Sequence, residues 1–170
     1  METSTVRLYS LNYSQTKTYI FSAAFVIGNI ALPQGCHLVN LGGPMWLPIY
    51  FFTLIAAYKY GLKVGLLTAA LSPIINSVLF GMPAAQMLPI ILVKSGLLAI
   101  AASFAANYFK KVSFLGIISA VIAYQLIGTI IEYFIVGGWY TALQDIRIGI
   151  PGILTQIIGG YFVLRYLLKN

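Results

Sequence analysis

The clearest indication of the fold is the segment Gln86–Lys111, which reads QMLPIILVKSGLLAIAASFAANYFKK. Its apolar run contains one charge, Lys94, and it ends at the pair Lys110–Lys111. A helix that crosses a membrane needs about 20 mostly apolar residues. We therefore expect residues 86–109 to form such a helix, with the lysine pair at its cytoplasmic end, because basic residues concentrate on that side.

The whole chain has the same character. Of its 170 residues, 60% are hydrophobic and 8% are charged, whereas soluble domains carry about 25% charged residues. A chain this apolar is expected to have the lipid bilayer as its solvent. Spanning helices of about 20 residues each would use most of the length. This predicts a single transmembrane domain over residues 1–170 and leaves no room for a soluble catalytic domain.

Glycine, proline and lysine divide the chain into apolar segments. We predict an all-α bundle of six transmembrane helices, over residues 17–32, 45–60, 64–80, 86–109, 113–136 and 148–168. The first helix is expected to end at Pro33, because proline cannot continue the hydrogen-bond pattern. Loops are expected over Gln34–Pro44 and Gly137–Arg147, where glycines gather.

The basic residues indicate an orientation. With the N-terminus inside, the inner segments hold eight of the ten basic residues and the outer loops only Arg147. The eight are Arg7, Lys17, Lys59, Lys63, Lys110, Lys111, Arg165 and Lys169. This split predicts that both termini are cytoplasmic. It also accounts for the net charge of +7 without nucleic acid, since no basic cluster exceeds a pair.

Two charges lie within predicted helices in the outer half of the bilayer. Lys94 is about 12 Å, and Glu132 roughly 6–7 Å, from the outer end of its helix at 1.5 Å per residue. A charge in the membrane costs several kcal/mol by most estimates, at least about 2.5, so both side chains should face the interior and find partners. Two interpretations stay open: an ion pair that holds the bundle together, or contact with a ligand.

Other polar and aromatic residues extend this outer-half site. Gln125 shares a helix face with Gly128 and Glu132, and Gln156 shares one with Gly152 and Gly159. Glycines on such faces let a backbone or a ligand approach closely. We expect a polar pocket that opens outward. Beside Lys94 and Glu132, the candidate ligand contacts are His37, Asn40, Trp46, Asn76, Gln86, Gln125, Trp139 and Gln156. The two tryptophans would equally suit an interfacial belt.

The sequence predicts no chemistry of its own. It has one histidine and one cysteine, too few for a protein-only metal site, and we expect no metal or cofactor. Cys36 and His37 could at most contribute to a metal-bearing ligand such as a corrinoid. No hydrolase, metalloprotease or Walker motif is present, so we expect neither an enzyme nor ATP hydrolysis by this chain.

Short motifs in four stretches of the chain bear a resemblance to a known family. They are the Gly-Gly-Pro and Leu-Pro of Leu41–Ile49, the Gly-x-x-x-Gly of Gly61–Gly65, Leu71-Ser72-Pro73, and Gly81-Met82-Pro83. With six helices and inside termini, the chain resembles the substrate-binding S components of energy-coupling factor (ECF) vitamin transporters. The resemblance covers nearly the whole chain.

The resemblance implies a role and partners. Such a subunit captures a scarce micronutrient at the outer face of a prokaryotic plasma membrane. It delivers the ligand inward with a membrane coupling (T) subunit and two cytoplasmic ATPases. The family's Ala-x-x-x-Ala docking motif would fall on Ala24 and Gly28, with glycine as the second small residue. His37 and Asn40 would lie in a loop that covers the ligand.

Three functions remain open from the residues themselves. The chain is a ligand-binding transporter subunit, a stand-alone carrier or channel, or a structural membrane protein. Ala24 and Gly28 form a small-xxx-small pair that suits either packing within the bundle or docking. The substrate is also open: Lys94 suggests a carboxylate or phosphate on the ligand, whereas Glu132 suggests an amine or a ring N–H donor.

Overall fold

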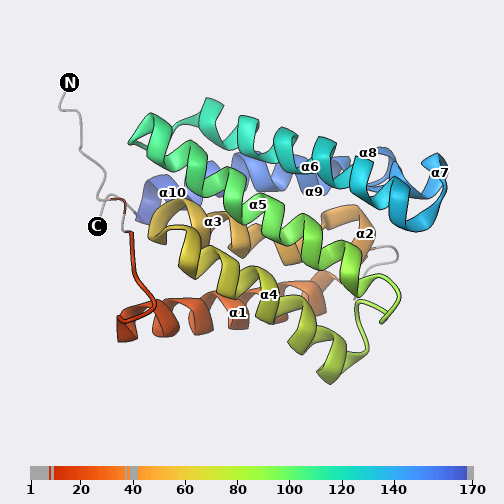
Figure 1. The fold of residues 1–170 in the computed structure, drawn as a ribbon, viewed down its shortest axis with the longest axis horizontal. Coiled ribbons are helices and arrows are strands. Elements are labelled where there is room, and N and C mark those ends of the chain that lie inside the picture. The colour runs from red at the N-terminus through yellow and green to blue at the C-terminus, as the bar shows by residue number, and fades with distance from the viewer. Residues whose placement is uncertain (1–7, 9, 37, 39–41, 168–170) are drawn as a thin grey trace.

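The computed structural model describes residue 8, residues 10–36, residue 38 and residues 42–167. Within these ranges the chain is helical and contains no strand, so the all-α prediction is confirmed. Figure 1 shows an elongated bundle whose long helices lie along its long axis, some in one direction and some in the other. The elements are α1 (Thr16–Cys36), α2 (Gly42–Trp46), η1 (Pro48–Tyr50), α3 (Phe51–Tyr60), α4 (Leu62–Phe80), α5 (Leu88–Phe109), α6 (Phe114–Val136), α7 (Trp139–Ala142), α8 (Gln144–Arg147), α9 (Ile150–Leu154), η2 (Thr155–Gly159) and α10 (Gly160–Leu167).

Five helical segments are long and apolar enough to cross a membrane: α1, α4, α5, α6 and the continuous stretch Ile150–Leu167. Many large apolar side chains on these segments point outward, among them Val78, Phe104 and Phe134, each more than 70% exposed. A soluble monomer rarely presents so much apolar surface. Such a surface is typical of an integral membrane protein, where lipid covers it.

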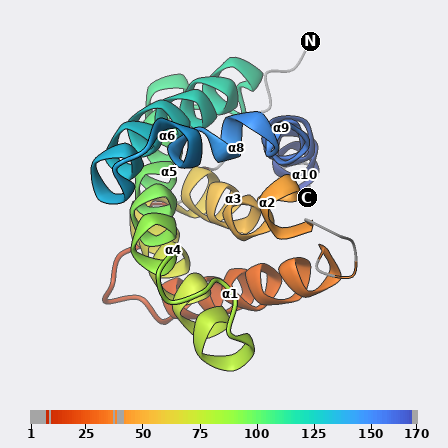
Figure 2. The same cartoon turned by 90° about the vertical axis from the view of Figure 1, so that its right-hand side faces the viewer.

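The remaining predicted helix, the one over residues 45–60, is short and central. Figure 2 looks along the bundle and places α3 in the middle, with α1, α4, α5, α6 and α10 around it. From Thr53 to Tyr60 every residue of α3 is buried, as expected for a helix that is apolar on all sides. The three residues of η1 and ten of α3 extend only roughly 20 Å at 1.5 Å per residue, less than a bilayer core.

The prediction of one helix over residues 45–60 is therefore wrong at its start. The chain leaves helix α2 at Leu47, which adopts a left-handed conformation with φ 46° and ψ 45°. The next residue is Pro48, and a proline disfavours right-handed helical geometry in the residue before it. Helix resumes only after Pro48, first as the 3₁₀ turn η1 and then as α3.

The predicted end of the first helix is also wrong. Helix α1 continues through Pro33 to Cys36. A proline removes one backbone hydrogen-bond donor. Where the residues after it remain helical, the helix bends at the proline and continues. Smaller differences are that α5 begins at Leu88 rather than at Gln86, and that the predicted loop 137–147 contains the short helices α7 and α8.

Close packing of α3 and α4 depends on a missing side chain. A Cβ at Gly65 would stand 2.5 Å from the Cβ and 2.8 Å from the Cα of Ala57. The helices thus approach with almost no side chain between them, as small residues allow in membrane proteins. Gly61 connects the two helices with φ 93°, a conformation that favours glycine.

The two ends of the bundle differ. In Figure 1 the C-terminal ends of α3 and α5 and the N-terminal ends of α4 and α6 lie together on the left. We call this the basic end, because it carries Lys59, Lys63, Lys110 and Lys111. Lys59 donates to the carbonyl of Leu167 at 2.6 Å, which ties α3 to the end of α10. Helices α2, α7 and α8 gather at the opposite end, which we call the cavity end.

Candidate functional site

A cavity of about 480 Å³ lies at the cavity end. The break between α2 and α3 forms part of its wall, because Leu47 and the three residues of η1 line it. Its volume falls in the range of about 300–1,000 Å³ found for small-molecule sites. The lining residues are Pro33, Gly43, Pro44, Leu47, Pro48, Ile49, Tyr50, Asn76, Met82, Pro83, Ala84, Met87, Ile90, Ile91, Lys94, Glu132, Gln144 and Asp145.

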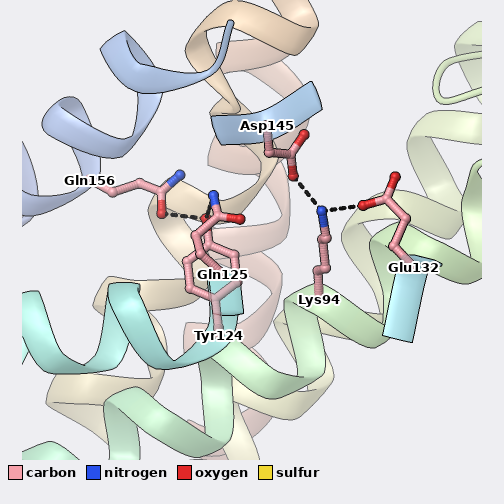
Figure 3. A network of polar contacts seen from close by, with 6 residues as sticks. All are labelled: Lys94, Tyr124, Gln125, Glu132, Asp145 and Gln156. Carbon is pink, nitrogen blue, oxygen red and sulfur yellow. Dashed lines mark hydrogen bonds and ion pairs between the residues drawn. The ribbon is translucent and has the colours of Figure 1, made fainter. Parts of the chain in front are cut away.

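Three charged side chains meet on the wall of this mostly apolar cavity. The Lys94 Nζ lies 2.5 Å from Glu132 Oε2 and donates to Asp145 Oδ2 at 2.7 Å. Figure 3 shows the lysine between the two carboxylates. The side chains of Lys94 and Glu132 are almost fully buried, and that of Asp145 is 16% exposed. We call these three residues the charged triad.

Each member of the charged triad comes from a different element. Lys94 lies on α5, Glu132 in the last turns of α6, and Asp145 on the short helix α8. Gly128 lies one turn before Glu132, and a Cβ there would stand 2.7 Å from Lys94 Cγ. The glycine thus leaves room for the lysine stem, which lets the ammonium reach both carboxylates.

Asn76 contributes a different kind of group to the same cavity. Its Nδ2 donates to the carbonyls of Asn29 at 2.9 Å and Ser72 at 3.1 Å, which defines the orientation of the amide. Asn76 is 1% exposed, and its Oδ1 is buried without a hydrogen-bond partner. Buried polar atoms are seldom left unpaired. Asn76 thus brings to the cavity wall a buried acceptor without a hydrogen-bond partner.

A second polar network lies outside the cavity lining. Tyr124 donates to Gln156 Oε1 at 2.9 Å and accepts from Gln125 Nε2 at 3.1 Å. Figure 3 shows this group beside the charged triad and separate from it. Gln156 lies in the π-helical segment η2, and such segments are frequent at functional sites. The rings of Tyr124 and Tyr50 lie 5.5 Å apart, so the network supports a residue that lines the cavity.

The candidate residues from the sequence fall into four groups. Asn76, Lys94 and Glu132 line the cavity. Gln125 and Gln156 are buried in the second network. His37 and Asn40 lie outside the described residues. The remaining three are not among the residues that line the cavity: Trp46, Gln86 and Trp139.

These three residues have other surroundings. Gln86 is exposed in the turn before α5. Trp139 is 53% exposed, and its ring stacks on Tyr133 at 4.1 Å, as in an interfacial belt. Trp46 is 40% exposed. Its backbone packs so closely on Gly152 that a Cβ there would stand 2.4 Å from the Trp46 carbonyl.

Sequence reasoning missed Asp145 and Tyr50. The chain has three acidic residues, and Glu2 lies near the N-terminus. Besides Glu132, Asp145 was therefore the one further candidate counter-ion for a lysine inside the membrane. The small number of acidic residues pointed to Asp145, but the residue was not considered because it falls in a predicted loop. Nothing in the sequence distinguishes Tyr50 from the other eleven of the twelve tyrosines.

The two small residues of α1 have different surroundings. A Cβ at Gly28 would stand 2.9 Å from the ring of Phe52, so Gly28 packs within the bundle. Ala24 is exposed, as are Ile20 and Ile27 near it on α1. Of the predicted docking pair, Ala24 is exposed and Gly28 is half-buried against Phe52.

The described residues contain no group of three or more histidine, cysteine, aspartate or glutamate side chains that could hold a metal ion. Comparison with known proteins adds no assignment: no family model, curated protein or solved structure matches this chain.

Proposed function

We propose that this chain is the substrate-binding S component of an ECF-type importer for a vitamin or related micronutrient. The observation that carries the proposal is the charged triad on the wall of an apolar cavity of about 480 Å³. A few convergent polar groups in an apolar pocket are the usual composition of a small-molecule site. Charges inside a membrane are also expensive, and they commonly mark ligand or ion sites.

The proposed arrangement has the cavity end facing outward and the basic end facing the cytoplasm of a prokaryotic cell. Five segments cross the plasma membrane, and the η1–α3 stretch makes a sixth, shorter crossing in the middle of the bundle. Both termini then lie inside, in agreement with the concentration of lysines at the basic end. A membrane coupling subunit docks on the exposed face of α1 around Ala24, and two cytoplasmic ATPases supply the energy.

The cavity favours a binding subunit over a stand-alone carrier or channel. A translocation path would continue toward the basic end. All described residues that line the cavity belong to its own end, and those between Lys94 and Lys110 on α5 do not contribute. A cavity that does not continue toward the basic end suits a subunit that holds a ligand and relies on a partner to release it inward.

The test is mass spectrometry of small molecules released from gently purified protein. The full chain should release one compound at near one-to-one stoichiometry. Ala84→Trp places a large ring in the cavity, and the matched control Ala85→Trp alters the neighbouring exposed residue that does not line it. We expect the compound to be lost from Ala84→Trp and kept by Ala85→Trp. Equal release from all three proteins, or none from the native chain, would contradict the proposal.

A second experiment tests the partners. A tagged chain purified from its native membranes in mild detergent should bring a second membrane protein and ATPases with Walker motifs. Ala24→Trp should weaken this association, because the ring would disturb the exposed face of α1. Val78→Trp, at a 78% exposed position of α4, serves as the control and should leave it intact.

A further inference from the structure

We propose that the ligand carries a cationic nitrogen or a strong N–H donor, which binds the Asp145 carboxylate and the Asn76 carbonyl, and an apolar body that fills the rest of the cavity. This inference rests on the proposed function, because it names the class of molecule that the same site takes. It chooses between the two ligand groups that the sequence left open, an anion facing Lys94 or a donor facing a carboxylate.

The first step is the charge of the site. Glu132 and Asp145 are the two acidic residues of the described chain, and both lie within 2.7 Å of the Lys94 ammonium. With all three groups ionised, one positive charge faces two negative charges. Lys94 is therefore already paired with protein carboxylates, and an anionic ligand would have to displace one of them. The excess negative charge favours a cation.

The second step is the free acceptor. The Asn76 amide has both its Nδ2 hydrogens committed to the carbonyls of Asn29 and Ser72. Turning the amide over would point its carbonyl oxygen at two other oxygens and lose both hydrogen bonds. The buried Oδ1 is thus held as an acceptor without a partner, and a ligand donor would satisfy it. This observation is independent of the charged triad.

The third step assigns the carboxylate. Glu132 lies closer to the Lys94 Nζ, at 2.5 Å, and only 4% of its side chain is exposed. Asp145 has 16% of its side chain exposed, and with Gln144 it belongs to the short helix α8 at the cavity wall. Asp145 is the carboxylate that a ligand reaches first. Lys94 and Glu132 can remain paired while Asp145 shares its charge with the ligand.

The fourth step is the remaining surface. The rest of the lining is almost entirely apolar and includes Pro48, Met87 and Ile90. Such a surface contributes affinity by burying apolar area and offers no partner for a second charge. The ligand class is therefore a small organic monocation or N–H donor with an uncharged, apolar body.

The experiment uses three probes of nearly equal shape that differ in charge: benzamidine (cationic), benzamide (neutral) and benzoate (anionic). Binding to the full-length protein in nanodiscs is measured by saturation-transfer NMR and by thermal shift. We expect benzamidine to bind at least about tenfold more tightly than benzamide, since hydrogen bonds to a charged group are roughly twice as strong as neutral ones. Benzoate should bind more weakly than both. Equal affinities, or tightest binding of benzoate, would overturn the inference.

Variants locate the preference. Asp145→Asn keeps the shape of the side chain and removes one negative charge, and it should reduce the preference for benzamidine over benzamide to about threefold or less. Arg147→Gln is the control, because it changes one charge of the same short helix at a residue that does not line the cavity. A native preference that survives in Asp145→Asn would contradict the role of Asp145.

The compound released from the purified protein separates the two proposals. If a compound lost from Ala84→Trp is an anion without an N–H donor, the site binds ligands but the inferred class is wrong. If no compound is released and none of the three probes binds, the proposed function fails and the inference fails with it.

Discussion

Gly128 lies against the stem of Lys94: a Cβ at position 128 would stand 2.7 Å from Lys94 Cγ and 3.2 Å from its Cε. This relationship joins α6 to α5 at the cavity and leads to the first prediction. Gly128→Ala should push the lysine away from Glu132 and Asp145 and destabilise the protein by about 1–3 kcal/mol, the usual cost of overpacking a tight site. Thermal unfolding in nanodiscs measures it.

The control for this substitution is Gly96→Ala. Gly96 lies on α5, two residues from Lys94, and a Cβ there would meet nothing within 4 Å. Alanine favours helix by up to about 1 kcal/mol over glycine, so this variant should be as stable as the native protein or more so. If Gly128→Ala matches Gly96→Ala in stability, the lysine stem can shift without cost and the geometry described for the charged triad is wrong.

The charged triad itself predicts a non-additive result. Lys94→Met removes the ammonium that pairs with both carboxylates. It should destabilise the protein by about 3–5 kcal/mol, because breaking a buried ion pair leaves an uncompensated charge. The triple variant Lys94→Met, Glu132→Gln, Asp145→Asn has no charge left in the site and should recover most of this loss.

Unfolding of the single and triple variants under the same conditions gives the coupling free energy between the lysine and the two carboxylates. A triple variant that is less stable than Lys94→Met would mean that the carboxylates do not depend on the lysine.

The sequence was sufficient for the long helices and for part of the site. The five long segments could be located because lipid requires a continuous apolar run, and the prediction for residues 86–109 differs from α5 by two residues at one end. Lys94 and Glu132 were recognisable because a charge inside an apolar helix needs a partner. The sequence does not indicate whether that partner is a protein side chain or a ligand.

Other features depend on tertiary contacts. The break at Leu47 is a local effect of Pro48, and the rule for residues before proline would have located it. Asp145 reaches Lys94 across 51 positions of sequence, and such a long-range contact is set by how α8 folds back on the bundle. The free Oδ1 of Asn76 likewise depends on where the carbonyls of Asn29 and Ser72 lie, which no pattern of residue types encodes.

Asn29 is a buried hydrogen-bonding centre that the sequence did not single out. Its Nδ2 donates to the hydroxyls of Thr53 at 3.1 Å and Ser72 at 3.2 Å, and its Oδ1 accepts from the Phe52 N–H at 3.2 Å. Helices α1, α3 and α4 thus meet at one side chain. We expect Asn29→Ala to cost about 1–3 kcal/mol, because the Phe52 N–H loses its acceptor in the interior.

Thermal unfolding of Asn29→Ala is compared with that of Asn107→Ala. Asn107 is an exposed asparagine near the end of α5, and its replacement should change stability by less than about 0.5 kcal/mol. Equal unfolding temperatures for the two variants would show that the Asn29 bonds do not hold the three helices together.

The orientation in the membrane can be tested with the single cysteine of the chain. Cys36 ends α1 at the cavity end and is partly exposed. Ser14 is exposed just before α1, at the basic end. With the cavity end outside, a membrane-impermeant maleimide added to intact cells should label Cys36 in the native chain. In the variant Cys36→Ser, Ser14→Cys it should label nothing until the membrane is permeabilised.

This exchange leaves every basic residue in place, so the topogenic charge pattern is unchanged. The reverse labelling would place the cavity on the cytoplasmic side, and labelling of both positions in intact cells would be incompatible with α1 crossing the membrane.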